Sequence, residues 1–352
     1  MDAGSNPANS TNKLFLFFLN KIMIKKLIFI KKKKIKNKRI DKFLFFFLKK
    51  KISRKKIQKN IFKKKILLNK KNINKKNKKI KLNDKIVIFI FKKKKKKIIE
   101  NKNIKINIIY EDNYLLIINK QPGLVVHPGY GNYNNTLINW LKFYFKKKKK
   151  KKLNYSNYRF GLLHRLDKDT SGLLLIAKTK HSFINIKNQF LNKTIKKKYL
   201  TLIWGKPFKK KDVIKNYIGR DLNNRIKMKV YNNKKYGKFS VTKYKIIKNY
   251  KFLTLVKCII KTGRTHQIRV HFNSIGHSIF NDKIYGGNKI KIFNKKKNKK
   301  KILKCFKILP RLALHSYYLK FNHPINNKKI IFSIKLPNDI KNLIKYIKKK
   351  LF

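Results

Sequence analysis

The chain has 352 residues, of which 98 are Lys or Arg and only 12 are Asp or Glu, giving a formal net charge of +86. This length allows two domains of ordinary size, and the charge favours a polyanionic partner such as RNA. The two cysteines, Cys258 and Cys305, show neither paired nor metal-ligand spacing, so neither a disulfide framework nor a zinc site is indicated. The apolar stretch 14–19 is too short to cross a bilayer, so no membrane segment is expected.

Part of the positive charge has a simple alternative explanation. Lys, Asn, Ile, Phe and Tyr dominate the chain, and all are specified by A/T-rich codons, so genome composition alone can supply many lysines. The lysine runs 92–97 and 146–152 are therefore interpreted as solvated loops rather than RNA contacts. Basic residues outside these runs still far outnumber acidic ones.

The first 38 residues differ in composition from the rest of the chain. Their opening is rich in Ser, Asn and Gly, and lysines interrupt the apolar residues further on. We predict that 1–38 is a basic, disordered leader.

A small helical region is predicted from residue 39. Apolar residues between positions 40 and 47 have helical spacing, and Ser53 stands where an N-cap would open a second helix over 55–63. An apolar pair at 67–68 and a β-branched run at 86–90 then predict two short strands.

Two basic helices leading into a small strand layer resemble the S-four RNA-binding domain, the αL motif, over residues 39–91. In that family the second helix and the adjacent turn meet RNA phosphates, so the resemblance implies RNA contacts at Arg54, Lys55 and Gln58. A merely basic helical hairpin is the alternative. Residues 92–99 are predicted to be a lysine linker to a catalytic domain over 100–343.

The longer second region mixes strands and helices. Apolar runs at 114–119 and 124–126 predict a strand–turn–strand unit. Further elements are predicted in this order: helix 136–145, strand 173–178, helix 181–192, strand 197–205 and strand 252–260. The economical fold class is α+β, with a mixed, mainly antiparallel sheet flanked by helices.

The most informative segment is 164–172, His-Arg-Leu-Asp-Lys-Asp-Thr-Ser-Gly, which runs directly into an apolar strand. In a chain so poor in carboxylates, Asp167 follows Arg165 by two positions and precedes a Thr-Ser-Gly turn. A loop that ends at a buried strand is a suitable place to present a reactive group. Asp169 is the alternative carboxylate, but a turn-capping role beside Thr170 and Ser171 suits it better.

A second group of polar residues lies in segment 261–272. If Thr265 caps a helix that ends at Gly276, then His266 and Arg269 share the face opposite the apolar residues and face a cleft. Arg264 lies near the amino end of that helix, where the dipole disfavours cations. A nearby phosphate would explain its position, so Arg264 and His266 are predicted substrate contacts.

Together these segments resemble the RluA family of pseudouridine synthases, and most closely its RluC and RluD branch, which carries an amino-terminal S-four domain. The matching segments recur in the family's order at 119–128, 164–179, 197–205, 218–221, 262–271, 276–277, 282–286 and 314–315. The resemblance implies isomerisation of uridine to pseudouridine within RNA, without a cofactor or a metal.

The resemblance also implies residue roles. It places the catalytic carboxylate at Asp167, the active-site tyrosine at Tyr199, the arginine paired with the aspartate at Arg269, and an arginine that holds the target base out of its stack at Arg165. Residue chemistry agrees, because an ionised Asp can act as a nucleophile or steady charge, and a paired arginine keeps it ionised. Tyr199 can stack on uracil and assist proton removal from C5. Three roles stay open for Asp167: attack on the ribose, attack on the uracil ring, or stabilisation of charge alone.

Several structural alternatives accompany these roles. His164 and His266 can be packed or hydrogen-bonded structural groups, and Tyr199 can be an ordinary core aromatic. An S-four-type RNA-binding or ribosome-assembly factor without catalytic activity would keep the basic surface but would not need Asp167. The expected partner is ribosomal RNA of the large subunit, with transfer RNA as the alternative. We expect a monomer in bacterial cytoplasm, or alternatively in an organellar matrix.

Overall fold

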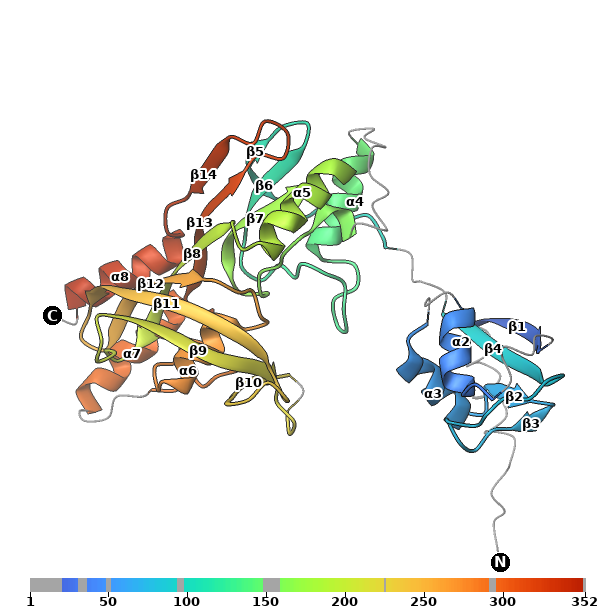
Figure 1. Cartoon of the computed structure of the whole chain (residues 1–352). Helices are drawn as coiled ribbons and strands as arrows, with labels where there is room; N and C mark the ends of the chain where they lie inside the picture. Colours follow the sequence, from blue (N-terminus) through green and yellow to red (C-terminus); the bar gives the residue numbers. More distant parts are fainter. Residues whose placement is uncertain are drawn as a thin grey trace, which may run out of the picture. The chain divides into compact units, whose positions relative to one another are not determined.

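The computed structural model describes residues 21–30, 37–48, 52–93, 98–147, 159–224, 226–290 and 296–350. The chain divides into two compact units, Met1–Lys97 and Ile98–Phe352 (Figure 1). In the described part of the chain, no helix is both long and apolar enough to cross a membrane.

The first unit packs two short helices against a small sheet. The helices are α2 (Ile40–Phe47) and α3 (Arg54–Phe62), and the sheet has the order β1 (Lys21–Phe29), β4 (Lys85–Lys93), β2 (Ile66–Leu68), β3 (Lys71–Asn72). Its core consists almost entirely of isoleucine side chains. Each helix contributes two buried residues four positions apart, which lie on the same helical face: Ile40 and Leu44 in α2, Ile57 and Ile61 in α3. The predicted helix pair and strand layer are confirmed.

The prediction of a disordered leader over 1–38 is wrong for Lys21–Phe29. These residues form β1, which pairs antiparallel with β4 along its whole length, and Ile28 lies in the core. Local composition concealed the strand, because its stability comes from hydrogen bonds to residues some sixty positions away. The rest of the predicted leader up to residue 36, apart from Ile30, and the linker residues 94–97 lie outside the described residues.

The second unit is built on a ten-stranded sheet. Its order is β10–β9–β11–β12–β8–β13–β7–β6–β5, with β14 paired to β13. The strands are β5 (Asn107–Glu111), β6 (Leu115–Lys120), β7 (Ser171–Ala177), β8 (Lys196–Trp204), β9 (Lys211–Arg220), β10 (Met228–Tyr231), β11 (Lys238–Asn249), β12 (Leu253–Ile260), β13 (Leu314–Asn322) and β14 (Lys329–Ser333). The helices are α4 (Leu137–Lys147), α5 (Lys180–Leu191), α6 (Gln267–Ser274), α7 (Lys296–Ile308) and α8 (Asn338–Lys350).

Strands β6 and β7 have an apolar layer on both faces. Leu116 and Leu174 lie in the larger core together with α4, while Leu115 and Leu173 lie in a smaller one with Ile186 of α5. This explains why both strands are continuous apolar runs rather than alternating ones. The mixed, mainly antiparallel sheet is confirmed, and its one parallel pair among the described strands joins β7 to β13.

The contact between β7 and β13 requires a glycine. Gly172 has a φ of 116°, and a Cβ built on it would lie 2.2 Å from the carbonyl oxygen of Ser316. Any other residue would therefore push the strands apart. The glycine fixes where β7 starts, and with it the end of the loop that carries Asp167.

Three sequence expectations fail in this unit. Segment 124–126 is not a strand, since Val125 forms only an isolated bridge with Thr136. The lysine run 146–152 is not purely a loop, because α4 extends to Lys147, and in the first unit β4 likewise extends to Lys93. The predicted domain end at 343 falls inside α8, whose Ile347 is fully buried in the core.

Candidate active site

The catalytic and substrate contacts predicted in the second unit line one cavity of about 350 Å³. They come from a loop, a strand and the start of a helix that are far apart in the sequence: Arg165, Asp167, Tyr199, Arg264, His266 and Arg269. The contacts predicted in the first unit belong to a separate compact body.

Two buried basic side chains hold the loop that presents Asp167. Lys120, fully buried, donates to the carbonyl oxygen of Lys168 at 3.0 Å and also to two carbonyls of the neighbouring turn. Arg311 donates to the carbonyl oxygen of Asp169 at 3.1 Å. Because both bonds end on the backbone, they fix the position of the loop without neutralising the Asp167 carboxylate.

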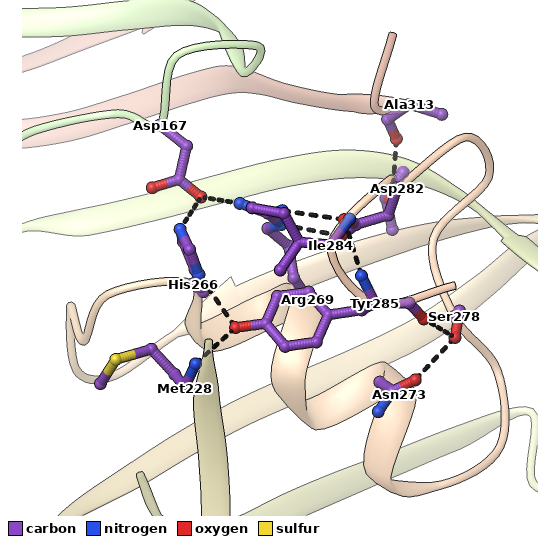
Figure 2. A network of polar contacts seen from close by, with 11 residues as sticks. Asp167, Met228, His266, Arg269, Asn273, Ser278, Asp282, Ile284, Tyr285 and Ala313 are labelled. Carbon is purple, nitrogen blue, oxygen red and sulfur yellow. Dashed lines mark hydrogen bonds and ion pairs between the residues drawn. The ribbon is translucent and has the colours of Figure 1, made fainter. Parts of the chain in front are cut away.

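Asp167 belongs to a short chain of charges (Figure 2). Arg269 Nη1 donates to Asp167 Oδ2 at 3.0 Å. The other side of the same guanidinium donates to both oxygens of Asp282, at 2.7 and 2.8 Å. Asp282 Oδ1 also accepts from the backbone N–H groups of Ile284 and Tyr285. Asp282 thus fixes the orientation of the Arg269 guanidinium, so that its Nη1 points toward Asp167.

The burial of Arg269 explains why it needs two acids. Burial alone would lower the pKa of Arg269, but the hydrogen bonds and negative charges of Asp282 and Asp167 outweigh it and raise the pKa above its usual range. The residue stays charged at any working pH. Asp282 lies within one of the segments that match the family, but its pairing with Arg269 was not predicted. The scarcity of acids, 12 against 98 basic residues, was a signal that could have pointed to it.

His266 bridges Asp167 and Tyr285. Its Nε2 lies 3.8 Å from Asp167 Oδ2, and its Nδ1 lies 2.9 Å from the Tyr285 hydroxyl. That hydroxyl accepts from the Met228 N–H, so its own hydrogen is free to reach Nδ1. Burial lowers the pKa of His266 despite the nearby Asp167, which favours a neutral ring with its hydrogen on Nε2, facing the carboxylate.

The structure corrects the start of helix α6. The predicted cap at Thr265 is wrong, because the helix begins at Gln267 and the preceding His266 has a left-handed backbone with a φ of 55°. Among the described residues no side chain caps this helix, and Gln267 Oε1 instead accepts from the Arg264 N–H in the turn before it. The left-handed residue turns the chain so that His266 still reaches Asp167.

Tyr199 lies on β8 and is buried at the cavity wall. Burial, reinforced by the charge of Asp167 and opposed by a hydrogen bond with Ser316, raises the pKa of Tyr199 to about 12. The side chain is therefore a neutral phenol near pH 7, with a ring available for stacking.

Arg165 and Arg264 are exposed at the cavity. Arg264 Nε donates to the carbonyl oxygen of Phe239 at 3.3 Å, which leaves the end of the guanidinium for solvent or substrate. His164, by contrast, is a structural group: its Nε2 accepts from the Leu175 N–H at 3.0 Å, and burial and then the charge of Lys197 lower its pKa to about 3. The structural alternative for His164 fits these contacts.

The predicted RNA contacts of the first unit lie on α3. Arg54 Nε and Gln58 Nε2 both donate to Asp41 Oδ2, at 2.9 and 2.7 Å, while Lys55 is exposed. The first two side chains are therefore partly used inside the unit. In the described residues no group of three or more His, Cys, Asp or Glu side chains could hold a metal ion.

Comparison with known proteins identifies both units. The family model for RNA pseudouridylate synthase matches residues 114–274, and the model for the S4 domain matches residues 38–86. A solved structure, human RNA pseudouridylate synthase domain containing 4, shares the fold of the second unit with a TM-score of 0.53 and 23% identity, over 69% of this chain and 93% of that one.

Curated relatives are more similar. The ribosomal large subunit pseudouridine synthase D of Buchnera aphidicola subsp. Schizaphis graminum is 42% identical over 70% of this chain and 75% of the relative. The protein of the same name from Zymomonas mobilis is 38% identical over 70% and 74%. The chain belongs to the RluA family of RNA pseudouridine synthases, with an amino-terminal S4 domain. It is an intramolecular isomerase that acts on RNA.

Proposed function

We propose that this enzyme isomerises uridines of large-subunit ribosomal RNA, with Asp167 as its catalytic carboxylate. The names of the bacterial relatives support the ribosomal substrate. The observation that carries the residue assignment is the pairing of Asp167 with the clamped Arg269 in a cavity shared with Tyr199. A bacterial cytoplasmic location would agree with a ribosomal substrate.

The reaction rearranges atoms without adding any. The bond between N1 and C1′ breaks, the uracil turns, C5 bonds to C1′, and C5 loses a proton while N1 gains one. Asp167, with one oxygen bonded to Arg269, supplies the negative charge that attacks the substrate or steadies the positive charge on ribose. Tyr199 would stack on the base, and its neutral hydroxyl would assist removal of the C5 proton by accepting it while passing its own proton to solvent.

Substrate entry requires the uridine to leave its helix, which costs a few kcal/mol of unstacking. Arg165 and Arg264, exposed at the cavity, would offset this by binding flanking phosphates or filling the vacated stack. Arg54, Lys55 and Gln58 would add phosphate contacts from the S4 domain.

The test compares the wild type with Asp167→Asn and Asp169→Asn on large-subunit ribosomal RNA and on transfer RNA, scoring pseudouridine by chemical labelling. We expect modification of ribosomal RNA, a loss of at least about 10⁴-fold for Asp167→Asn, and a change below about tenfold for Asp169→Asn. RNA affinity should survive in both variants. An Asp167→Asn protein of normal rate would refute the assignment, and a wild type that binds RNA but forms no pseudouridine would favour the non-catalytic assembly factor.

A further inference from the structure

Three lysines are buried in the described residues, and one of them differs from the other two. Lys120 donates to three backbone carbonyls, and Lys178 pairs with Glu111 and also donates to the Asp112 carbonyl. Lys197 is 9% exposed, yet no acceptor lies within hydrogen-bonding distance of its ammonium group among the described residues. Burying a charge without a partner is costly, so such a group is retained where something else supplies the counter-charge.

The position of Lys197 shows where that counter-charge would be. The residue lines the catalytic cavity and lies two positions before Tyr199 on β8, so both side chains leave the same face of the strand. Its ammonium group lies 5.1 Å from the centre of the Phe190 ring and would be 3.5 Å from a Cβ built on Gly263. The charge therefore sits under the 263–264 loop, inside the cavity.

We propose that Lys197 is a further catalytic residue, whose ammonium group stabilises the negative charge that develops on the uracil carbonyl oxygens during isomerisation. The proposal rests on the function proposed above. If the N1–C1′ bond breaks first, the electron pair leaves with the base and spreads over its carbonyl oxygens. If Asp167 first adds to C6, the electron pair of the C5–C6 bond moves onto O4. Both routes place charge on the same edge of the base.

The walls around Lys197 favour a base over a phosphate. Phe190, Leu163 and Leu314 line the same cavity and, with the Tyr199 ring, offer apolar surface of the kind that a pyrimidine ring covers. A phosphate is better matched by Arg165 and Arg264, which are exposed to solvent. The ammonium group is thus preorganised for charge that appears only within the buried part of the substrate.

The experiment uses the full-length enzyme with Lys197→Met, Lys197→Arg and the matched control Lys198→Met. Lys198 is the next residue on β8, on the opposite face, with its ammonium group 3.9 Å from the centre of the Tyr318 ring. We expect Lys197→Met to lower the single-turnover rate about 10²- to 10³-fold at saturating RNA, with little change in RNA affinity. Lys197→Arg should retain part of the rate, and Lys198→Met should match the wild type.

The pH profile gives a second readout. Burial lowers the pKa of Lys197 to about 8, so the charged form, and with it kcat/KM, should decline as the pH rises through about 8. Lys197→Met should lose this decline. The other titratable or charged groups at the cavity are His127, Arg159, His164, Arg165, Asp167, Tyr199, Arg264, His266 and Arg269. Of these, His164 titrates near 3 and Tyr199 near 12, and the pKa values of His127 and His266 are lowered, all away from this decline.

Substrate chemistry separates the remaining possibilities. RNA carrying 4-thiouridine at the target forms a more stable base anion, so the rate loss caused by Lys197→Met should be smaller with this RNA.

A normal rate in Lys197→Met overturns the proposal. So does a loss of RNA affinity with an unchanged saturated rate, which would indicate a phosphate contact. Equal inactivity of Lys197→Met and Lys197→Arg with lowered melting temperatures would show a packing role. A wild type without pseudouridine product would instead refute the proposed function.

Discussion

Asp41 in the S4 domain and Asp167 in the catalytic unit are both carboxylates paired with arginine, but their surroundings differ. Asp41 is fully buried and accepts from Arg39, Arg54, Gln58 and its neighbouring backbone. Asp167 is 18% exposed, and one of its oxygens accepts from Arg269 while no partner of the other is found among the described residues. Asp41 therefore receives several hydrogen bonds and Asp167 only one from the part of the chain that the structure describes, which is consistent with a structural role for Asp41 and with the catalytic role that we propose for Asp167.

The two sites also differ in how their cations are supported. At Asp41 several donors converge on one acid, and they lower its pKa to about 2 even though burial acts in the opposite direction. At Asp167 the situation is reversed, because Arg269 is shared by Asp167 and Asp282. Asp282 accepts a bidentate pair of hydrogen bonds from it. Asp282 thus orients the guanidinium of Arg269, and Asp167 receives only a single bond from it, as its proposed role requires.

The largest effect should come from breaking the support of Arg269. Asp282→Asn removes one of the two carboxylates that pair with the buried guanidinium of Arg269. Removing one partner of a buried ion pair lowers the free energy of unfolding by about 3–5 kcal/mol. We expect a turnover loss of about 10²- to 10³-fold, because Arg269 would shift from Asp167. Thermal unfolding measures the loss of stability, and single-turnover kinetics measure the loss of rate. Asp221→Asn, on an exposed turn, is the control, and a fully active Asp282→Asn would contradict the clamp.

A smaller, pH-dependent effect is expected at Asp41. Its folded pKa lies below the ordinary value of 3.8, so its contribution is complete above pH 3.8 and is lost as the pH falls through about 2. Asp41→Asn should therefore lower the stability of the S4 domain by about 2 kcal/mol at neutral pH and by almost nothing near pH 2. Amide hydrogen exchange of β4 in the intact chain reports this stability. A pH-independent difference would show that packing, not charge, is lost.

The smallest effect should separate two neighbouring residues of α3. Lys55→Ala removes an exposed charge and should weaken RNA binding by less than about tenfold, while reducing the salt dependence by about one ion. Arg54→Ala should in addition destabilise the domain, because it removes a donor to Asp41. Binding titrations at several salt concentrations, with β4 exchange alongside, distinguish them. Equal destabilisation by both variants would place Lys55 in the fold instead.

The sequence predicted what local pattern and motif order encode. The α+β sheet, the two S4 helices and the roles suggested for Asp167, Tyr199 and Arg269 all came from segments with a strong local signal. What it did not predict depends on distant contacts, such as the pairing of Asp282 with Arg269 or of β1 with β4. The left-handed backbone of His266 was also missed, and so was the contact of its side chain with Tyr285, a residue that another segment contributes.

Gly172 is a position at which the chain cannot accept a substitution. The chain is rich in lysine and asparagine, which A/T-rich codons specify, and substitutions on an exposed surface usually change stability little. At the junction of β7 and β13 there is no room for even one methyl group. A codon change at Gly172 would therefore introduce a side chain that cannot fit, five residues after Asp167, the carboxylate that we propose to be catalytic. We expect such a change to displace the Asp167 loop and to leave the basic RNA-binding surface unchanged.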